Sequence, residues 1–138
     1  MTTSKYSLPQ SERINSKKQI DRLFRGGGSK AMTASPLRMV YMADSRQTDS
    51  QPSDGHQPMA QMMVSVPKRY FKRAVKRKRV KRQVRESFRH NKHLLDDKLQ
   101  AGHYAVAIAF VWLTDSQYTT AEVEHRVVQL LTRINERL

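Results

Sequence analysis

The chain has 138 residues, no cysteine and a formal net charge of +14, from 26 Lys and Arg against 12 Asp and Glu. This composition excludes a disulfide framework and a thiolate zinc site, and no run of about 18 apolar residues is present to cross a membrane. A chain this basic favours a polyanionic partner, most often nucleic acid, with an anionic membrane surface as the alternative. One domain, residues 1–138, fits this length. Without an apolar signal segment, we expect the protein to work in the cytosol.

The N-terminal part begins with a polar stretch followed by a short helix. Residues 1–15 are polar, and we expect them to form a flexible tail. A helix is predicted at residues 16–25, because Ser16 can cap its start and the glycines from Gly26 can end it. Its apolar side chains share one face: Ile20, Leu23 and Phe24.

Two strands are predicted on either side of a polar loop. Residues 36–43 and 60–66 alternate in the manner of strands. Residues 44–58 between them are polar and rich in turn formers, so we expect a flexible loop. Because only this loop separates the two strands, an antiparallel hairpin is their simplest pairing. Alternation gives each strand one face of larger side chains: Leu37, Met39 and Tyr41, and then Met62, Val64 and Val66.

The C-terminal part contains the most apolar strand and an amphipathic helix. Residues 103–112 are apolar on both faces, so this strand is predicted to be central, with its face of three alanines under closely packed helices. Thr119 and Glu122 form the capping-box pattern of a helix that runs to Leu138. With a helix in the basic segment before this strand, the order is α-β-β-α-β-α. This order predicts an α+β fold, a two-layer α-β sandwich in which helices cover a small sheet.

The segment FKRAVKRKRVKRQVRESFRHNK, residues 71–92, holds eleven Lys and Arg residues and one acid, Glu86. It lacks Pro and Gly, so a helix can run through it. Val80, Val84 and Phe88 recur every four residues and form a narrow apolar stripe that attaches this helix to the core. With about 100° of rotation per residue, a cationic strip lies away from that stripe: Lys78, Arg82, Arg85 and Arg89.

The single sign of these charges indicates a partner. A run of mixed charges is usually a solvated helix face, but here the positive sign dominates. Repulsion along the strip costs folding energy unless an anion relieves it, and phosphates would do so while releasing counterions. Arginine can also bind phosphate through two parallel hydrogen bonds. Since the helix offers little besides Gln83 and Ser87 to read DNA bases, it favours structured RNA over DNA.

These residues resemble the basic helix of the protein subunit of bacterial ribonuclease P, whose pattern is roughly A-V-x-R-N-R-x-K-R-x-x-R-E. The stretch AVKRKRVKRQVRE, residues 74–86, fits this pattern except at Lys78, where the family has Asn and where Lys would add a phosphate contact. Three other stretches are similar to the family: LPQSERINSKKQIDRLFRGGGS, VSVPKRYFKRAV and AGHYAVAIA. With the amphipathic last helix, the resemblance covers about residues 8–138.

The resemblance implies an α-β sandwich with a left-handed βαβ crossover, whereas chirality rules alone predict a right-handed one. It implies an RNA-binding subunit of ribonuclease P, the ribonucleoprotein endonuclease of tRNA processing that removes the 5′ leader from precursor tRNA. The catalytic centre is then RNA with bound Mg²⁺, so we expect no metal or cofactor on the protein alone and no catalytic side chain. The implied partners are the ribonuclease P catalytic RNA and precursor tRNA, with no membrane and no DNA.

The functional positions of the family can be carried over residue by residue. The RNA-binding positions of the basic helix are Arg73, Lys76, Arg77, Lys78, Arg79, Lys81, Arg82, Arg85 and Arg89. The positions that match the cleft for the 5′ leader are Ile20, Phe24, Tyr41, Ser65 and Lys68. Without the resemblance, the two aromatic residues of that cleft would be interpreted as core residues, and its serine and lysine as solvated.

Two other functions stay open on the residues alone. A ribosomal or other structural RNA-binding protein shares the charge and similar folds. A self-sufficient nuclease is less favoured, because no Ser-His-Asp or paired-carboxylate arrangement can be read from the spacing. His90 and His93 are three residues apart, but no third metal ligand is evident near them.

Overall fold

The computed structural model describes residues 12–14, 16–25, 27–45, 60–102 and 104–138. Four strands form one sheet in the order β1-β2-β4-β3. Their bounds are Lys30–Ala34 for β1, Leu37–Ser45 for β2, Ala60–Ser65 for β3 and Tyr104–Trp112 for β4. The helices are α1 (Lys17–Arg25), α2 (Ala74–Asn91), α3 (Asp96–Gly102) and α4 (Thr120–Arg137), and the 3₁₀ turn η3 (Lys92–Leu95) joins α2 to α3. The predicted N-terminal tail and the predicted loop lie almost wholly outside the described residues.

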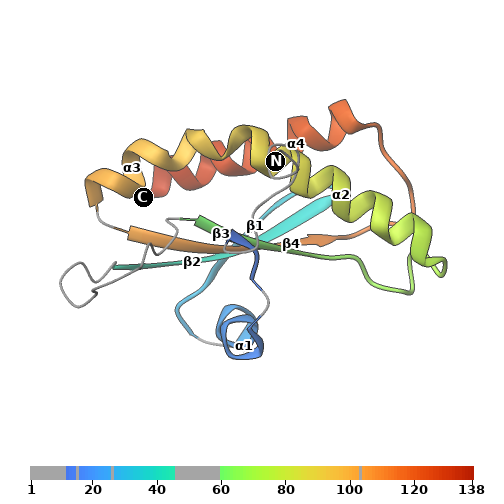
Figure 1. Cartoon of the computed structure of the whole chain (residues 1–138), viewed down its shortest axis with the longest axis horizontal. Coiled ribbons are helices and arrows are strands. Elements are labelled where there is room, and N and C mark those ends of the chain that lie inside the picture. Colours follow the sequence, from blue (N-terminus) through green and yellow to red (C-terminus); the bar gives the residue numbers. More distant parts are fainter. Residues whose placement is uncertain (1–11, 15, 26, 46–59, 103) are drawn as a thin grey trace, which may run out of the picture.

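The helices cover the two faces of the sheet unequally. Figure 1 shows α2, α3 and α4 on one face and α1 alone on the other. The sheet and the larger helical layer are the two layers of the predicted α+β sandwich, and α1 adds a small third one. Among the described helices, none combines the length and the apolar character needed to span a bilayer.

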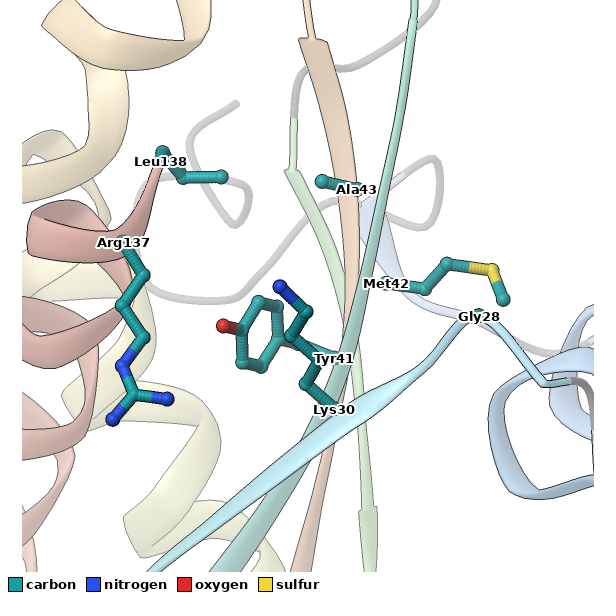
Figure 2. A pocket seen from close by; sticks show the side chains of 7 residues that line it. All are labelled: Gly28, Lys30, Tyr41, Met42, Ala43, Arg137 and Leu138. Carbon is teal, nitrogen blue, oxygen red and sulfur yellow. The ribbon is translucent and has the colours of Figure 1, made fainter.

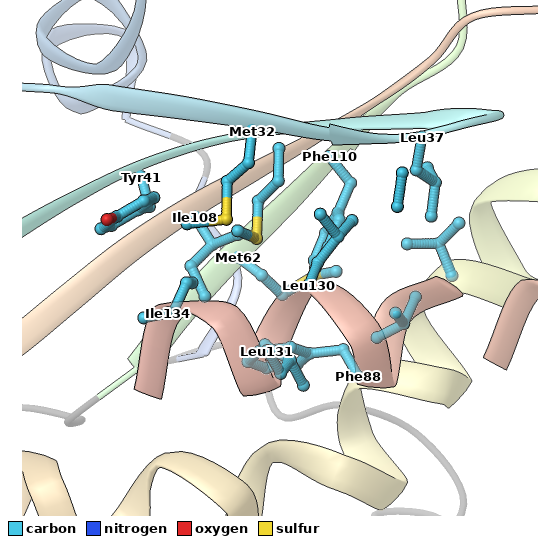
Figure 3. Packing of buried hydrophobic residues seen from close by; sticks show 14 of the residues in the cluster. Met32, Leu37, Tyr41, Met62, Phe88, Ile108, Phe110, Leu130, Leu131 and Ile134 are labelled. Atoms are coloured by element: carbon cyan, nitrogen blue, oxygen red, sulfur yellow. The ribbon is translucent and has the colours of Figure 1, made fainter. Parts of the chain in front are cut away.

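The main core lies between the sheet and the larger helical layer. In Figure 3, Ile108 and Phe110 of β4 point toward Leu130 and Leu131 of α4, and Phe88 of α2 closes the same cluster. Fully burying one such side chain contributes about 1.5–3 kcal/mol, so this face carries most of the hydrophobic stabilisation. A smaller cluster under α1 fills the other face and contains Ile14, Leu23, Val40 and Ala109.

The pairing of β3 differs from the sequence prediction. β2 and β3 do not form a hairpin, because β4 lies between them, antiparallel to β2 and parallel to β3. A strand that is apolar on both faces buries more surface at the centre of a sheet than a neighbour at its edge would, as predicted for β4. Parallel pairing requires a long crossover, and α2, η3 and α3 form it. The left hand of this crossover stays a prediction from the resemblance.

The strand β1 and the surroundings of β4 are two further differences. β1 pairs with β2 from Lys30 to Ala34 across a turn with a cis Ser35–Pro36 bond, and it has no counterpart among the predicted elements. Its sequence KAMTA has a weak apolar alternation, so the pairing with β2 defines the strand. The prediction of closely packed helices over the alanines of β4 is met by one helix only, α1. Ala109 faces the small cluster under α1, and the large side chains of β4 face α2 and α4.

The helix starts follow their capping signals, with one exception. The predicted capping box of α4 is confirmed, since the Thr119 side chain accepts from the Glu122 amide and the Glu122 carboxylate accepts from the Thr119 amide. At α1, the hydroxyl of Ser16 accepts from the Gln19 amide at 3.4 Å. At α2, Arg73 occupies the N-cap position without a capping side-chain bond, and the first turn contains no acid. α2 therefore forms without the local capping signals that begin α1 and α4.

Candidate nucleic-acid interface

One side of α2 is fixed to the rest of the molecule by apolar and polar contacts. Val80, Val84 and Phe88 are fully buried, as their spacing predicts. The side-chain amide of Gln83 donates to the carbonyl oxygen of Tyr118 at 3.1 Å, just before α4. These contacts fix the rotation of α2 about its axis, and this rotation decides which of its charges face outward.

The outward side of α2 carries cations with few acids to neutralise them. α2 contains eight Lys and Arg residues and one acid, Glu86, which pairs with Arg89 at 2.9 Å. Four residues form what we call the cationic ridge: Lys78, Lys81, Arg82 and Arg85. None of the four has an acidic partner within the described part of the chain. Two of them are exposed and two half-buried, so the ridge is open to a partner from outside.

The ridge is held against its own repulsion by burial on the opposite side of the helix. Each pair of like charges one turn apart costs about 0.2–0.5 kcal/mol, and Lys78–Arg82 and Lys81–Arg85 are such pairs. Burying one Val or Phe side chain contributes about 1.5–3 kcal/mol, so the apolar stripe outweighs the repulsion. A bound polyanion would remove this cost and leave the burial unchanged.

The N-terminal segment adds a cation beside the ridge. Residues 12–14 follow the outer edge of β3, where the amide of Ile14 donates to the carbonyl oxygen of Met62 at 2.8 Å. Burial and, secondly, the like charge of Arg13 lower the pKa of Arg85 from its ordinary value. Since the Arg85 guanidinium stays charged at neutral pH, the shift marks a place where an anion would stabilise the positive charge. Sequence reasoning missed Arg13, because only the pairing with β3 brings it near α2.

The other predicted RNA-binding residues of α2 and its N-cap divide into two groups. Arg77 folds back on the segment before the helix, where it donates to the carbonyl oxygens of Phe71 at 2.7 Å and Lys72 at 2.9 Å. Arg89 is occupied by its ion pair with Glu86. Both thus have contacts within the protein with which a polyanion would compete. The second group is exposed: Arg73, Lys76 and Arg79.

The α1 face of the sheet brings together most of the predicted leader positions. Ile20 and Phe24 lie on α1, and Phe24 leaves 43% of its surface exposed, so it is not a core aromatic. Ser65 ends β3 on the face of Met63, which packs in the small cluster under α1. Lys68 follows this strand and is exposed.

The helix α1 itself adds positive charge to this face. Leu23 anchors the helix, and the side-chain amide of Gln19 donates to Gln61 of β3 at 2.7 Å. Four cations of α1 are exposed: Lys17, Lys18, Arg22 and Arg25. The α1 face therefore offers an exposed aromatic ring beside several cations.

Tyr41 does not belong to this face. Its side chain is 4% exposed and lies in the main core with Met39, on the side of α4 (Figure 3). The neighbouring residues Val40 and Met42 pack on the α1 side instead. The prediction that Tyr41 shares a cleft with Ile20 and Phe24 is therefore wrong, because the alternation of β2 puts them on opposite sides of the sheet.

The described residues offer charge and apolar contact rather than a constellation for chemistry. Within the described ranges, no group of three or more His, Cys, Asp or Glu side chains is placed to hold a metal ion. His90 contacts the guanidinium of Arg89 at 2.9 Å. The two surfaces are thus suited to binding a polyanion.

Comparisons with known proteins find similar proteins over nearly the whole chain. A family model described as Ribonuclease P matches residues 8–135. The ribonuclease P protein component of Porphyromonas gingivalis is 40% identical over 129 residues, which cover 94% of this chain and 87% of that protein. The protein of the same name from Chlorobaculum tepidum is 29% identical over 136 residues, which cover 91% of this chain and 84% of that protein.

Two solved structures share the fold. The RNase P protein of Thermotoga maritima superposes with a TM-score of 0.63 at 17% identity, covering 88% of this chain and 96% of that one. The RNase P protein of Staphylococcus aureus gives a TM-score of 0.61 at 16% identity, covering 89% of this chain and 94% of that one. At such identities the likeness concerns the fold alone.

Proposed function

Because the chain belongs to the ribonuclease P protein family, and so is a subunit of an endoribonuclease that associates with RNA, we propose a role for each of its two basic surfaces. The cationic ridge of α2 binds the ribonuclease P RNA, and the α1 face holds the 5′ leader of precursor tRNA. The observation that carries the proposal is the ridge, whose four cations face outward with no acidic partner among the described residues.

The chemistry of the ridge suits the phosphate backbone. Arginine presents a planar fork that matches phosphate oxygens, and lysine adds a point charge. The polar side chains of α2 that could read bases are turned away from the ridge, because Gln83 and Ser87 are buried. Binding therefore depends on the shape and charge of folded RNA, and the release of counterions drives it.

The α1 face suits a single strand. An exposed aromatic ring can stack on an unpaired base, and cations beside it can follow the backbone. Phe24 supplies the ring, and Lys17 and Lys18 are among the cations of the same helix. We assign the cleavage itself, and the Mg²⁺ it uses, to the RNA subunit, as the resemblance implies, and we place the reaction in the cytosol.

Reconstitution with a bacterial ribonuclease P RNA tests the proposal. Adding this protein should raise 5′-leader cleavage at low Mg²⁺, because the ridge neutralises phosphates that divalent cations would otherwise have to screen. No increase would favour a structural RNA-binding protein instead. Protein treated with micrococcal nuclease and purified from RNA should leave precursor tRNA intact, and cleavage by such protein would contradict an RNA-borne catalytic centre.

Phe24→Ala tests the α1 face separately. Losing a base stack costs about 1–3 kcal/mol, so the Kd of the holoenzyme for leader-bearing precursor tRNA should rise about fivefold or more, and the Kd for mature tRNA should not change. Val75→Ala is the matched control, because Val75 is also apolar and is 76% exposed but lies on α2. If Phe24→Ala weakens binding of both RNAs equally, or lowers the unfolding temperature of the protein while it weakens binding of both, Phe24 serves packing and not leader binding.

A further inference from the structure

A pocket of about 200 Å³ lies at the edge of the sheet that is farthest from β3. It opens between β1, β2 and the C-terminal end of α4, and its lining includes Lys30, Tyr41, Arg137 and Leu138 (Figure 2). β1 and β3 are the two edge strands of the sheet, so this pocket and the pairing edge of residues 12–14 lie at opposite ends of the strand order. Neither surface of the proposed function uses the pocket.

The lining of this pocket includes a buried hydroxyl that has no partner among the described residues. Tyr41 is 4% exposed, and its hydroxyl oxygen has no hydrogen-bond partner among the residues that the structure describes. Figure 2 shows this hydroxyl directed toward the last turn of α4, away from the strand that carries it. Buried polar groups in folded proteins almost always have a partner, so an unpaired donor in a pocket points to a ligand with an acceptor oxygen.

The charges around the pocket select the type of acceptor. Lys30 and Arg137 are exposed, and neither forms an ion pair with any described residue. The C-terminal end of α4 opposes them with about half a negative charge, and the main-chain carboxylate of Leu138 in the lining adds one more. The two full positive charges exceed this sum. The pocket therefore favours an anion. A carboxylate has two oxygens for three donor groups, whereas a phosphoryl group has at least three that can each meet one of them.

We propose that this pocket binds a phosphoryl group, with the Tyr41 hydroxyl donating to one oxygen and Lys30 and Arg137 pairing with the others. The flexible Lys30 side chain can move to admit the ligand. The volume leaves room beyond a single phosphate, so the group can belong to a free phosphate or nucleotide or to the backbone of an RNA. The site is independent of the cationic ridge, and its failure would leave the proposed function intact.

Amide chemical shifts test the site on the full chain, because they separate this pocket from binding at α2. The protein is titrated at constant ionic strength with inorganic phosphate, with adenosine 5′-monophosphate, and with a six-nucleotide RNA that lacks terminal phosphates. Saturable shifts of the amides in β1 and the last turn of α4 are expected. Saturation by the first two probes alone identifies a free phosphate as the ligand, and saturation by the RNA as well identifies a backbone phosphate. No saturable shift with any probe overturns the proposal.

Two variants and one control assign the shifts to the named groups. Tyr41→Phe and Arg137→Gln should each raise the Kd measured at these amides about tenfold, since each removes a hydrogen bond to a charged group. Arg133→Gln removes the same charge one turn earlier on α4, outside the pocket lining, and should change this Kd less than twofold. Tyr41→Phe keeps the ring in the core, so the unfolding temperature of the protein without ligand should not fall. Equal Kd values for wild type and Tyr41→Phe would overturn the assignment.

Discussion

The helices α2 and α4 have the same length of 18 residues and pack beside one another on the same face of the sheet, yet they follow different rules. α4 begins with a capping box, has an acid in its first turn and a cation in its last, and contains three Glu and three Arg residues. α2 has no capping side chain, no acid in its first turn, and eight Lys and Arg residues against one acid. Both bury a full apolar stripe.

The difference separates what folding requires from what binding requires. Each feature of α4 lowers its free energy in isolation, as caps, dipole-matched charges and balanced surface charge do. α2 departs from each of these rules on its outward side and keeps only the buried stripe. A surface that costs folding energy has its purpose outside the folded chain, and for α2 the proposed purpose is to bind a polyanion. The comparison predicts that charge removal affects the two helices very differently.

The largest expected effect is on RNA affinity when Arg82 and Arg85 are both replaced by Ala. Each lost phosphate contact removes about 0.9 from the slope of log K against log salt, which amounts to about fivefold in affinity at about 0.15 M salt. The double variant should therefore bind ribonuclease P RNA about thirtyfold more weakly, with a flatter salt dependence. Filter binding at several KCl concentrations measures both quantities.

The matched control removes two charges from α4. Arg126 and Arg133 make contacts within the protein, to Gln129 at 3.3 Å and to the carbonyl oxygen of Thr33 at 3.1 Å. Arg126→Ala with Arg133→Ala changes the net charge by the same amount, and should leave the salt slope almost unchanged. Parallel salt slopes for the two double variants would mean that net charge, and not the ridge, governs binding.

Local sequence patterns correctly predict the parts of the fold that depend on residues a few positions apart in the chain. The stripe of Val80, Val84 and Phe88 and the capping box of α4 are such parts, and both are confirmed. The orientation of the ridge follows from the stripe, because helix geometry links the two sides of one helix.

Features that depend on contacts between residues far apart in the chain could not be predicted from the sequence. β1 is a strand because it pairs with β2. The parallel pairing of β3 with β4 requires the whole crossover from α2 to α3. Arg13 reaches the ridge only through that arrangement. For Tyr41, the alternation of β2 correctly predicts that its side chain and that of Val40 lie on opposite faces of the sheet. The alternation does not predict which of these faces α1 covers.

The smallest expected effect concerns the cap that α2 lacks. Hydrogen bonds from the amide and then the hydroxyl of Thr119 to Glu122 lower the pKa of the Glu122 carboxyl from its ordinary value. A carboxyl whose pKa is lower in the folded state stabilises the fold above its unfolded pKa, and this contribution is lost as the pH falls through the folded pKa. The unfolding temperature, measured by circular dichroism, should therefore fall less between pH 7 and pH 3 in Glu122→Ala than in wild type. Glu136→Ala, in the last turn of the same helix, should keep the wild-type dependence. If both variants keep it, the cap of α4 contributes nothing that α2 lacks, and the contrast between the two helices rests on surface charge alone.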